Sequence, residues 1–415
     1  MHFTFRTAGE SHGRGLVCVI EGVPAGLELS AGRDIDPDLR RRQGGYGRGG
    51  RMKIEKDAAE FMAGVRLGET IGSPIAFVVW NRDWENWKSA MAAEAGGDTT
   101  QADRKAVHLP RPGHADLVGV LKYDRADARD ILERASARET TARVGAGAVA
   151  RRMLADFGIT IGSHVVMLGG VEAGRPDPLP DDLNAAADAS PIRTLDPAAE
   201  RRMIEAIDAA KQAGDTLGGC FEVVARGLPV GLGSHVAWDR KLDGRIAQAM
   251  MSIQAMKGVE IGLGFEAARR PGSRVHDEIE RAPDSPRTGG FRRLSNSAGG
   301  LEGGITTGEP LVVHVAMKPL STLMQPLRSV DLRTGDVAQA VRERSDVVAL
   351  AAAGVVGEAM LAIVLADAML EKFGADSMTE MKRNFEAYLR QLEARTAALD
   401  RAAAARPEAQ RPAGT

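Results

Sequence analysis

The 415-residue sequence predicts an α+β fold, on three observations. Short β-branched runs bounded by Gly or Pro occur along much of the chain, and longer helical patterns lie between them. One helical segment, residues 346–374, is apolar on nearly every side, which is typical of a helix buried in a protein core. Its apolar runs are shorter than the roughly 20 residues that span a bilayer, so no membrane association is expected.

Each predicted strand is a run rich in Val, Ile and Phe that ends near turn residues. The strands are expected at residues 16–22, 74–80, 159–168, 220–227 and 310–317. Helices are expected at residues 126–158, 197–214, 240–258, 346–374 and 376–397, with Asp127 and Asp196 as N-caps of the first two. The Pro-, Asp- and Ala-rich segment 172–196 predicts a surface excursion.

The composition argues against several classes of protein. Lys and Arg total 54 against 56 Asp and Glu, which disfavours a dedicated nucleic-acid-binding protein. Cys18 and Cys220 are the only cysteines, too few for a disulfide scaffold or a four-cysteine zinc site, and no metal is expected. Residues 1–13 lack a signal-peptide pattern, so we expect a cytoplasmic protein.

Two motifs imitate better-known sites. GESHG at residues 9–13 matches the Gly-x-Ser-x-Gly elbow of serine hydrolases, but it precedes a predicted strand instead of joining a strand to a helix. A hydrolase with Ser11 as nucleophile therefore stays as the less favoured alternative. GAGAVA at residues 145–150 matches a dinucleotide fingerprint but lies inside a helical pattern. Its small residues are expected to allow two helices to pack closely.

Two stretches combine charge, glycine and histidine in a way that favours a ligand. Residues 40–53, RRRQGGYGRGGRMK, place arginines among glycines, so guanidinium groups and backbone can approach phosphate or carboxylate. A solvated basic loop, or an RNA-binding segment in which bases stack on Tyr46, is the alternative.

The second stretch is residues 109–119. Pro110 and Pro112 reduce the freedom of the loop before His114, which is either a catalytic group or a turn histidine.

Two further stretches occur near the C-terminal half. Residues 293–310 contain two Gly-Gly pairs and many hydroxyls, and MKPLST follows at 317–322. Backbone N–H groups, hydroxyls and Lys318 are suited to binding a phosphate or a flat polar ring, with a flexible surface loop as the alternative.

Asp346 stands before the apolar helix, where it acts either as a helix cap or as a catalytic acid or base.

Taken together, these motifs resemble those of the chorismate synthases, in that family's order and over nearly the whole chain. They are TAGESHGRG, RRRQGGYGRGGRM, RPGHADLVGVLKY, RASARET, GDTLGG, GLPVGLGS, IQAMKGVEIG, SNSAGGLEGGITTGEP, KPLST and RSDVVAL. The resemblance implies one domain over residues 1–400, built as a β-α-β sandwich with central helices between two antiparallel sheets, and a homotetramer. Residues 401–415 are of low complexity and are expected to form a disordered tail.

The resemblance also implies a lyase that converts 5-enolpyruvylshikimate 3-phosphate to chorismate and phosphate by 1,4-elimination with reduced FMN. This substrate has two carboxylates and a phosphate, and FMN adds another phosphate, so the pocket needs concentrated cations. NADPH is then required only indirectly, by an external flavin reductase, because the family pattern and the tail account for the whole chain.

The resemblance assigns roles to individual residues. His12 is expected to protonate the departing phosphate, His114 to protonate the reduced flavin, and Asp346 to assist proton removal at the flavin N5, with Ser11 as a polar partner beside His12. Arg42 and Arg48 match positions that contact NADPH or the substrate phosphate. The implied flavin contacts are Arg134, Ala135, Ser136, Gln254, Ala255, Gly303, Lys318, Pro319, Leu320, Ser321, Thr322 and Arg344.

Overall fold

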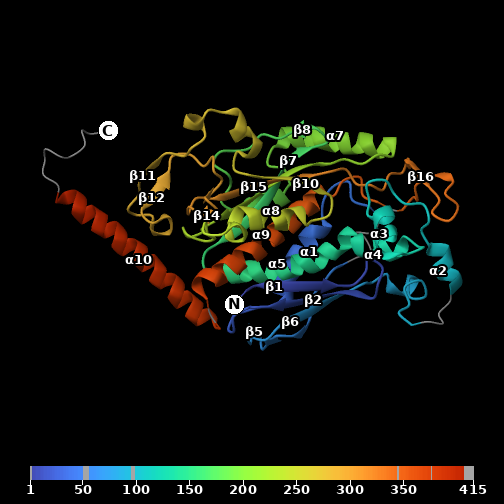
Figure 1. Ribbon diagram of the computed structural model, residues 1–415, viewed down its shortest axis with the longest axis horizontal. Helices are drawn as coiled ribbons and strands as arrows, with labels where there is room; N and C mark the ends of the chain where they lie inside the picture. Colours follow the sequence, from blue (N-terminus) through green and yellow to red (C-terminus); the bar gives the residue numbers. More distant parts are fainter. Residues whose placement is uncertain (1, 50–55, 95–98, 344, 375, 406–415) are drawn as a thin grey trace.

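The computed structural model describes residues 2–49, 56–94, 99–343, 345–374 and 376–405. Within these residues, two antiparallel sheets enclose a layer of helices, and Figure 1 shows the three layers stacked with one sheet below and one above. The predicted β-α-β sandwich is therefore confirmed. All five predicted strands are present within one residue of their expected bounds.

The first sheet has the strand order β1 (Thr4–Ala8), β2 (Gly15–Glu21), β6 (Ile75–Trp80), β3 (Glu60–Ala63). Because side chains alternate along a strand, one face of this sheet enters the core and the other faces outward. Leu16, Cys18 and Ile20 of β2 are buried, whereas Val17 and Val19 between them are exposed.

The second sheet has the strand order β10 (Met256–Ile261), β15 (Leu311–Met317), β9 (Gly219–Arg226), β7 (Thr160–Leu168), β8 (Val171–Glu172). Phe221 and Val223 of β9 are completely buried and approach Gly357 in the helical layer. The intervening Glu222 points to the opposite face, where it pairs with His164 of β7 and His314 of β15.

The helical layer contains α1 (Asp36–Gln43), α5 (Thr140–Ala155) and α9 (Leu350–Phe373). Gly147 of α5 lies directly against Ala359 of α9, so that any side chain at Gly147 would overlap the neighbouring backbone. The GAGAVA motif thus allows two helices to approach closely, as predicted. By length and composition α9 is also a candidate membrane span, but 94% of its most apolar window is buried inside the protein, as in a core helix.

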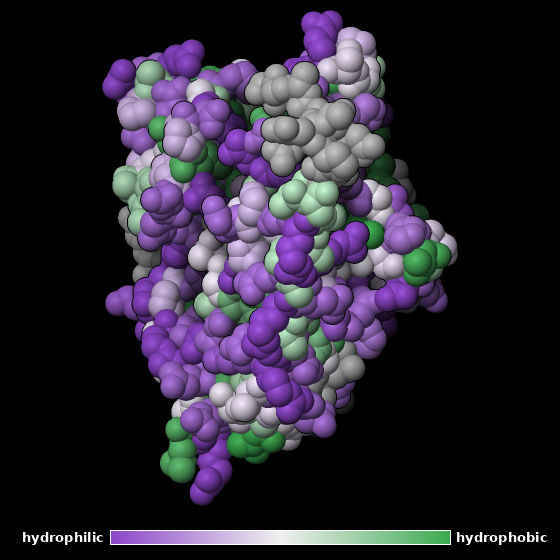
Figure 2. Space-filling model, turned by 90° about the vertical axis from the view of Figure 1, so that its left-hand side faces the viewer, coloured by the Kyte–Doolittle hydropathy of each residue, from purple (hydrophilic) through white to green (hydrophobic). Residues whose placement is uncertain are grey.

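The other elements surround these layers. The remaining α-helices are α2 (Thr99–Lys105), α3 (Asp116–Tyr123), α4 (Arg129–Ala135), α6 (Leu183–Asp188), α7 (Pro197–Ala213), α8 (Leu242–Met251) and α10 (Met378–Ala404). Two-stranded ribbons are formed by β4 (Val65–Arg66) with β5 (Glu69–Thr70), β11 (Ile279–Arg281) with β12 (Phe291–Arg293), β13 (Leu301–Glu302) with β14 (Ile305–Thr306), and β16 (Arg328–Val330) with β17 (Val337–Gln339). Figure 2 shows the end of the molecule that carries α10, which is predominantly hydrophilic.

Three sequence-based boundaries are corrected by the structure. The helix expected at 126–158 is divided at Ser136, and the helix expected at 240–258 ends at Met251. Segment 172–196 forms α6 and inserts Ile192 and Arg193 into the protein, where both are almost completely buried, so it is not only a surface excursion. Helix α10 continues to Ala404, into the segment predicted as a tail, and residues 406–415 lie outside the described part of the chain.

Candidate active site

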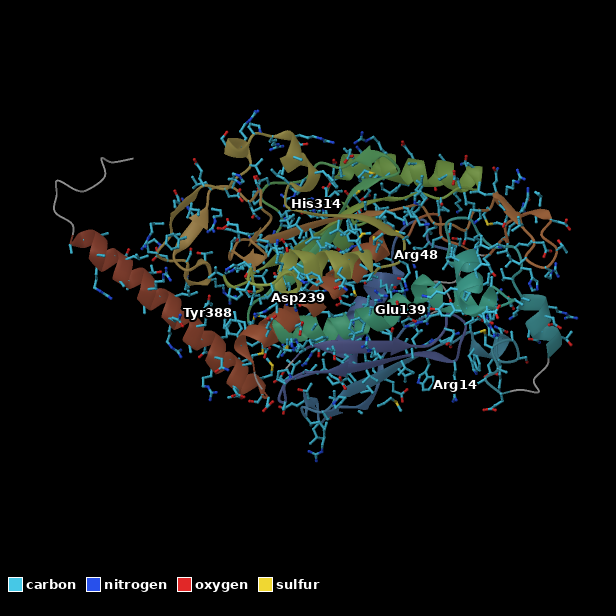
Figure 3. The ribbon with its side chains drawn as sticks, in the orientation of Figure 1. Arg14, Arg48, Glu139, Asp239, His314 and Tyr388 are labelled. Atoms are coloured by element: carbon cyan, nitrogen blue, oxygen red, sulfur yellow. The ribbon has the colours of Figure 1, made fainter. Side chains whose placement is uncertain are left out.

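A cavity of about 580 Å³ opens between the layers, within the size range of small-molecule sites. Its walls come from the β1–β2 connection, the end of α1, the loops around α3 and α4, the loop after β15 and the first turns of α9. Figure 3 shows Arg48, one of the lining residues, in the helical layer between the two sheets. Segments far apart in sequence therefore meet here.

His12 lies on the cavity wall and is held on two sides. Its Nδ1 atom is 2.9 Å from a carboxylate oxygen of Glu133, and its backbone N–H donates to the other oxygen at 2.7 Å. Its ring stacks on Trp87, with 3.7 Å between the centroids. Burial alone would raise the pKa of Glu133, but hydrogen bonds from His12 and the charge of Arg129 hold that pKa below its ordinary value.

His114 has a similar arrangement at another part of the wall. Its Nδ1 atom is 2.5 Å from Asp116, which is completely buried at the start of α3. Arg111 donates to both oxygens of Asp116 through its side chain and donates to Thr322 as well. Burial raises the pKa of Asp116, yet hydrogen bonds from His114 and Arg111 outweigh it and keep this pKa well below its usual range.

Asp346 faces the loop that follows α1. It accepts a hydrogen bond from the backbone N–H of Gly49 at 2.6 Å and pairs with Arg48 at 3.0 Å. Helix α9 begins only at Leu350, and its N-cap position is Ala349. Asp346 is therefore not the cap of this helix, and the helix-cap interpretation of this carboxylate is wrong.

Among the described residues, the cavity lining carries more cations than anions. The lining Lys and Arg residues are Arg42, Arg48, Arg111, Arg129, Arg138 and Lys318, whereas the lining Asp and Glu residues are Asp83, Glu343 and Asp346. Arg42 is almost completely buried and donates to Thr140 Oγ1 and the Ala137 carbonyl. Such fixed guanidinium groups suit phosphate and carboxylate, because they need little reorganisation to bind an anion.

Another part of the lining suits a flat ring with polar edges. Ile253, Met256 and Met317 contribute apolar surface to the cavity, as do the small residues at the start of α9. Gln254 follows Ile253 in the lining, and its buried Oε1 atom makes no hydrogen bond. A buried acceptor without a donor is costly, and a bound ligand with an N–H group would satisfy it.

Most of the predicted site residues line this cavity. They are Ser11, His12, Arg42, Arg48, His114, Ala135, Ser136, Gln254, Ala255, Lys318, Pro319, Leu320, Ser321, Thr322 and Asp346. Arg134 does not line it, because its guanidinium donates to the carbonyls of Thr7 and Gly9 on the β1 side. Gly303 lies in the turn between β13 and β14, also away from the lining, and Arg344 is outside the described residues.

The alternative sites predicted from sequence do not fit these contacts. Ser11 is only 3% exposed, accepts a hydrogen bond from Ser136, and lies in the turn between two strands, so GESHG does not form a hydrolase elbow. Arg41 binds the buried Glu358, and Arg42 is buried as well, so the first part of the basic stretch is not a solvated RNA-binding loop. Among the described residues, no group of His, Cys, Asp and Glu is arranged to hold a metal ion.

Several residues of the site were missed in the sequence. Asp116 and Arg111 lie within three residues of His114, so their proximity was a usable signal. Glu133 is 121 residues from His12, and no local pattern connects the two. Trp87 and Arg129 also come from segments that showed no motif of their own.

Comparison with known proteins gives one consistent result. The sequence profile of the chorismate synthase family matches residues 3–370. The chorismate synthase of Syntrophotalea carbinolica is 58% identical over 92% of this chain and 97% of its own length, and that of Aquifex aeolicus is 56% identical over 94% and 98%. A crystal structure of a chorismate synthase, 46% identical, superimposes with a TM-score of 0.74 over 95% of this chain and 99% of that one.

Proposed function

This chain belongs to the chorismate synthase family and is a lyase, and we propose that its cavity converts 5-enolpyruvylshikimate 3-phosphate to chorismate and phosphate with reduced FMN. The reaction is a 1,4-elimination, in which a C–H bond and the C–O bond to phosphate break and a second C=C bond forms in the ring. The observation that carries this proposal is the pair of carboxylate-bound histidines on the wall of a cation-rich cavity.

The charge of the lining supports an anionic substrate. Two carboxylates and a phosphate leave bulk water when the substrate enters, and arginines already held by neighbouring groups replace part of that hydration. Arg42 and Arg48 are proposed to receive a phosphate, either that of the substrate or that of NADPH. The histidines and Asp346 border the same space, so proton transfer takes place beside the bound anions.

We assign the protonation of the leaving phosphate to His12. The ionised Glu133 can only accept, so a hydrogen bond to it requires a proton on Nδ1 of His12. The Nε2 atom then serves as the proton donor when the imidazole is charged. A general acid at a departing oxygen contributes about 10²–10⁴-fold to a rate.

His114 and Asp346 are assigned to proton transfer at the cofactor. Reduced FMN, when bound, supplies transient electron donation to the substrate. His114 is proposed to protonate the reduced flavin, and Asp346 to assist proton removal at N5. Gln254, Ala255, Ala135, Ser136 and residues 318–322 are proposed to hold the cofactor, and the unpartnered Oε1 of Gln254 supports this use of the wall. For Arg134, Gly303 and Arg344 the flavin contact is proposed from the family resemblance.

The reaction is tested under anaerobic conditions. Purified protein is mixed with chemically reduced FMN and 5-enolpyruvylshikimate 3-phosphate, and chorismate and phosphate are measured together. We expect equal amounts of both products, with none from oxidised FMN alone. Intact protein that binds reduced FMN but releases neither product would refute the proposed activity.

Two histidine variants test the assigned residues. We expect His12→Ala and His114→Ala each to lower kcat by at least about 10²-fold, because each removes a proton-transfer group. His276→Ala is the matched control, since His276 is exposed and does not line the cavity. Full activity in either cavity variant would contradict the role given to that histidine.

The wider arrangement is proposed on the same basis. Val17, Val19 and Trp80 leave the outer face of the first sheet partly apolar and exposed, which supports assembly into a homotetramer. We propose a cytoplasmic enzyme that receives reduced FMN from an external reductase, with NADPH used by that reductase.

A further inference from the structure

Each of the two cavity histidines is bonded at Nδ1 to a carboxylate that is itself bonded to a lining arginine. We propose that Glu133 and Asp116 are positioning residues, which fix the tautomer and orientation of His12 and His114 for proton transfer through Nε2. This inference rests on the proposed function, because it assigns partners to the two histidines of that reaction. Neither carboxylate lines the cavity, so both act through the histidines.

Both oxygens of Glu133 face His12. Nδ1 of His12 lies 2.9 Å from one oxygen and 3.1 Å from the other, the backbone N–H of His12 donates to the second oxygen, and Arg129 approaches the first at 3.3 Å. The side chain of Glu133 is only 1% exposed, so water does not compete for these oxygens. Trp87 stacks on one face of the imidazole and fixes the plane of the ring, while Glu133 fixes the direction in which Nδ1 points.

Asp116 holds His114 through a shorter segment of chain. Arg111 donates to Asp116 from its backbone N–H and its side chain, while Nδ1 of His114 bonds to the carboxylate. Arg111 Nη2 also lies 3.1 Å from Nδ1 of His114, but two donors cannot bond to each other. With Nδ1 protonated toward Asp116, the Arg111 hydrogen bonds belong to the carboxylate and keep it ionised.

The same interaction therefore orients both histidines. An ionised carboxylate fixes the proton on Nδ1, which leaves Nε2 as the atom that exchanges a proton, as in other carboxylate–histidine pairs of enzymes. Arg129 and Arg111 line the cavity, so the groups that hold the carboxylates also face the bound anions.

The kinetic test uses Glu133→Gln and Asp116→Asn, which keep side-chain shape and remove charge. We expect kcat to fall by about 10²-fold or more in each, with substrate and FMN affinity changed less than about threefold, because the carboxylates touch neither ligand. Glu222→Gln is the matched control, since Glu222 is a buried carboxylate bonded to His164 and His314 on the outer sheet face. We expect the control to retain its kcat. Thermal unfolding of every variant identifies any loss that is due to folding.

A second measurement does not depend on catalysis. Diethyl pyrocarbonate reacts at the ring nitrogen that carries no proton, so its rate at each histidine, mapped by mass spectrometry at one fixed pH, depends on the tautomer and orientation of that ring. We expect the rate at His12 to change in Glu133→Gln and the rate at His114 to change in Asp116→Asn, because each variant loses the ionised acceptor of Nδ1, while the rate at His276 stays unchanged. This result would support the inference even if the wild-type protein produced no chorismate.

Two outcomes would overturn the inference. One is an unchanged modification rate at both histidines in folded variants, which would mean that the carboxylates do not set the tautomer and orientation of the rings. The other is a wild-type kcat in both variants while the histidine variants are inactive. If one variant does not fold, the other still decides its own pair, because the pairs share no residue.

Discussion

The contacts of Asp346 differ from those expected from its position in the sequence. It stands next to an apolar helix, yet it bonds to Gly49 and Arg48 of a distant loop. The short contact to the Gly49 N–H orients the carboxylate, and Arg48 balances its charge. Its charge and hydrogen bonds are therefore directed to the cavity wall and not to the N-terminus of α9.

Asp346→Asn tests whether the charge of this residue is needed. The amide oxygen can still accept from Gly49, but the ion pair with Arg48 is lost. We expect kcat to fall at least about tenfold with little change in thermal stability, because the carboxylate is proposed to take part in proton transfer. Steady-state assays with reduced FMN measure the effect.

Asp208→Asn is a suitable control for Asp346→Asn. Asp208 accepts from the hydroxyl of Tyr46, so it holds the same loop, but it does not line the cavity. We expect this control to keep its activity. If both variants lost activity equally, loop anchoring would account for the effect and the proton-transfer role of Asp346 would fail.

The site was predictable where its chemistry is local in sequence. His12, His114 and Asp346 stood out because each lies in a dense motif, and the structure brings all three to one cavity. Glu133 was not predictable, since it lies inside a helical pattern and its pairing with His12 depends on the fold of both segments. Spatial pairing of this kind is not encoded in any short pattern.

At the scale of elements, the ends of α4 and α8 were not predicted from the sequence, and both helices end close to residues that line the cavity, Ser136 and Ala255. Ser136 adopts an extended conformation and accepts a hydrogen bond from the Arg138 N–H, which ends α4 and starts a new turn. Ala255 has a φ of 69°, a left-handed conformation that is costly without glycine. Helical periodicity continues through both positions, so periodicity alone did not place the ends of these helices. The five main strands were predictable because turn residues bound them.

The contact between α5 and α9 predicts opposite effects for two glycine substitutions. Gly147→Ala places a methyl group against the backbone of Ala359, so we expect a loss of about 1–3 kcal/mol in the free energy of unfolding. Gly244→Ala in α8 meets no atom within 4 Å, so we expect a gain of about 0.5–1 kcal/mol from helix propensity. Chemical denaturation measures both, and a gain in Gly147→Ala would show that the helices can separate at little cost.

At the scale of the whole molecule, one buried carboxylate joins several segments. Glu358 of α9 is completely buried and pairs with Arg41, Arg151 and Arg193. Arg193 comes from the segment that the sequence predicted as an excursion. A polar, Pro-rich composition gave no sign of this, because the segment is fixed by charge pairing with a distant helix. The network therefore connects α1, α5, α9 and this segment.

Glu358 predicts a specific dependence of stability on pH. Burial alone would raise its pKa, but Arg41, Arg151 and Arg193 lower it from 4.5 to about 2. A carboxylate with a lowered pKa in the folded state stabilises fully above its unfolded value, and that contribution is lost as the pH falls through the folded value. We therefore expect part of the stability to disappear between about pH 4.5 and pH 2.

Glu358→Gln separates this contribution from those of other carboxylates. We expect the variant to lose about 3–5 kcal/mol at neutral pH, because three arginines remain beside a neutral amide. Below the ordinary pKa of glutamate its stability should fall less steeply than that of the wild type, by up to about 1.4 kcal/mol per pH unit. Glu371→Gln on the same helix is the control, since Glu371 is partly exposed and a loss of only about 1 kcal/mol is expected. Urea unfolding from pH 7 to pH 2 compares the three proteins, and equal slopes for Glu358→Gln and the wild type would show that Glu358 does not set the acid limit.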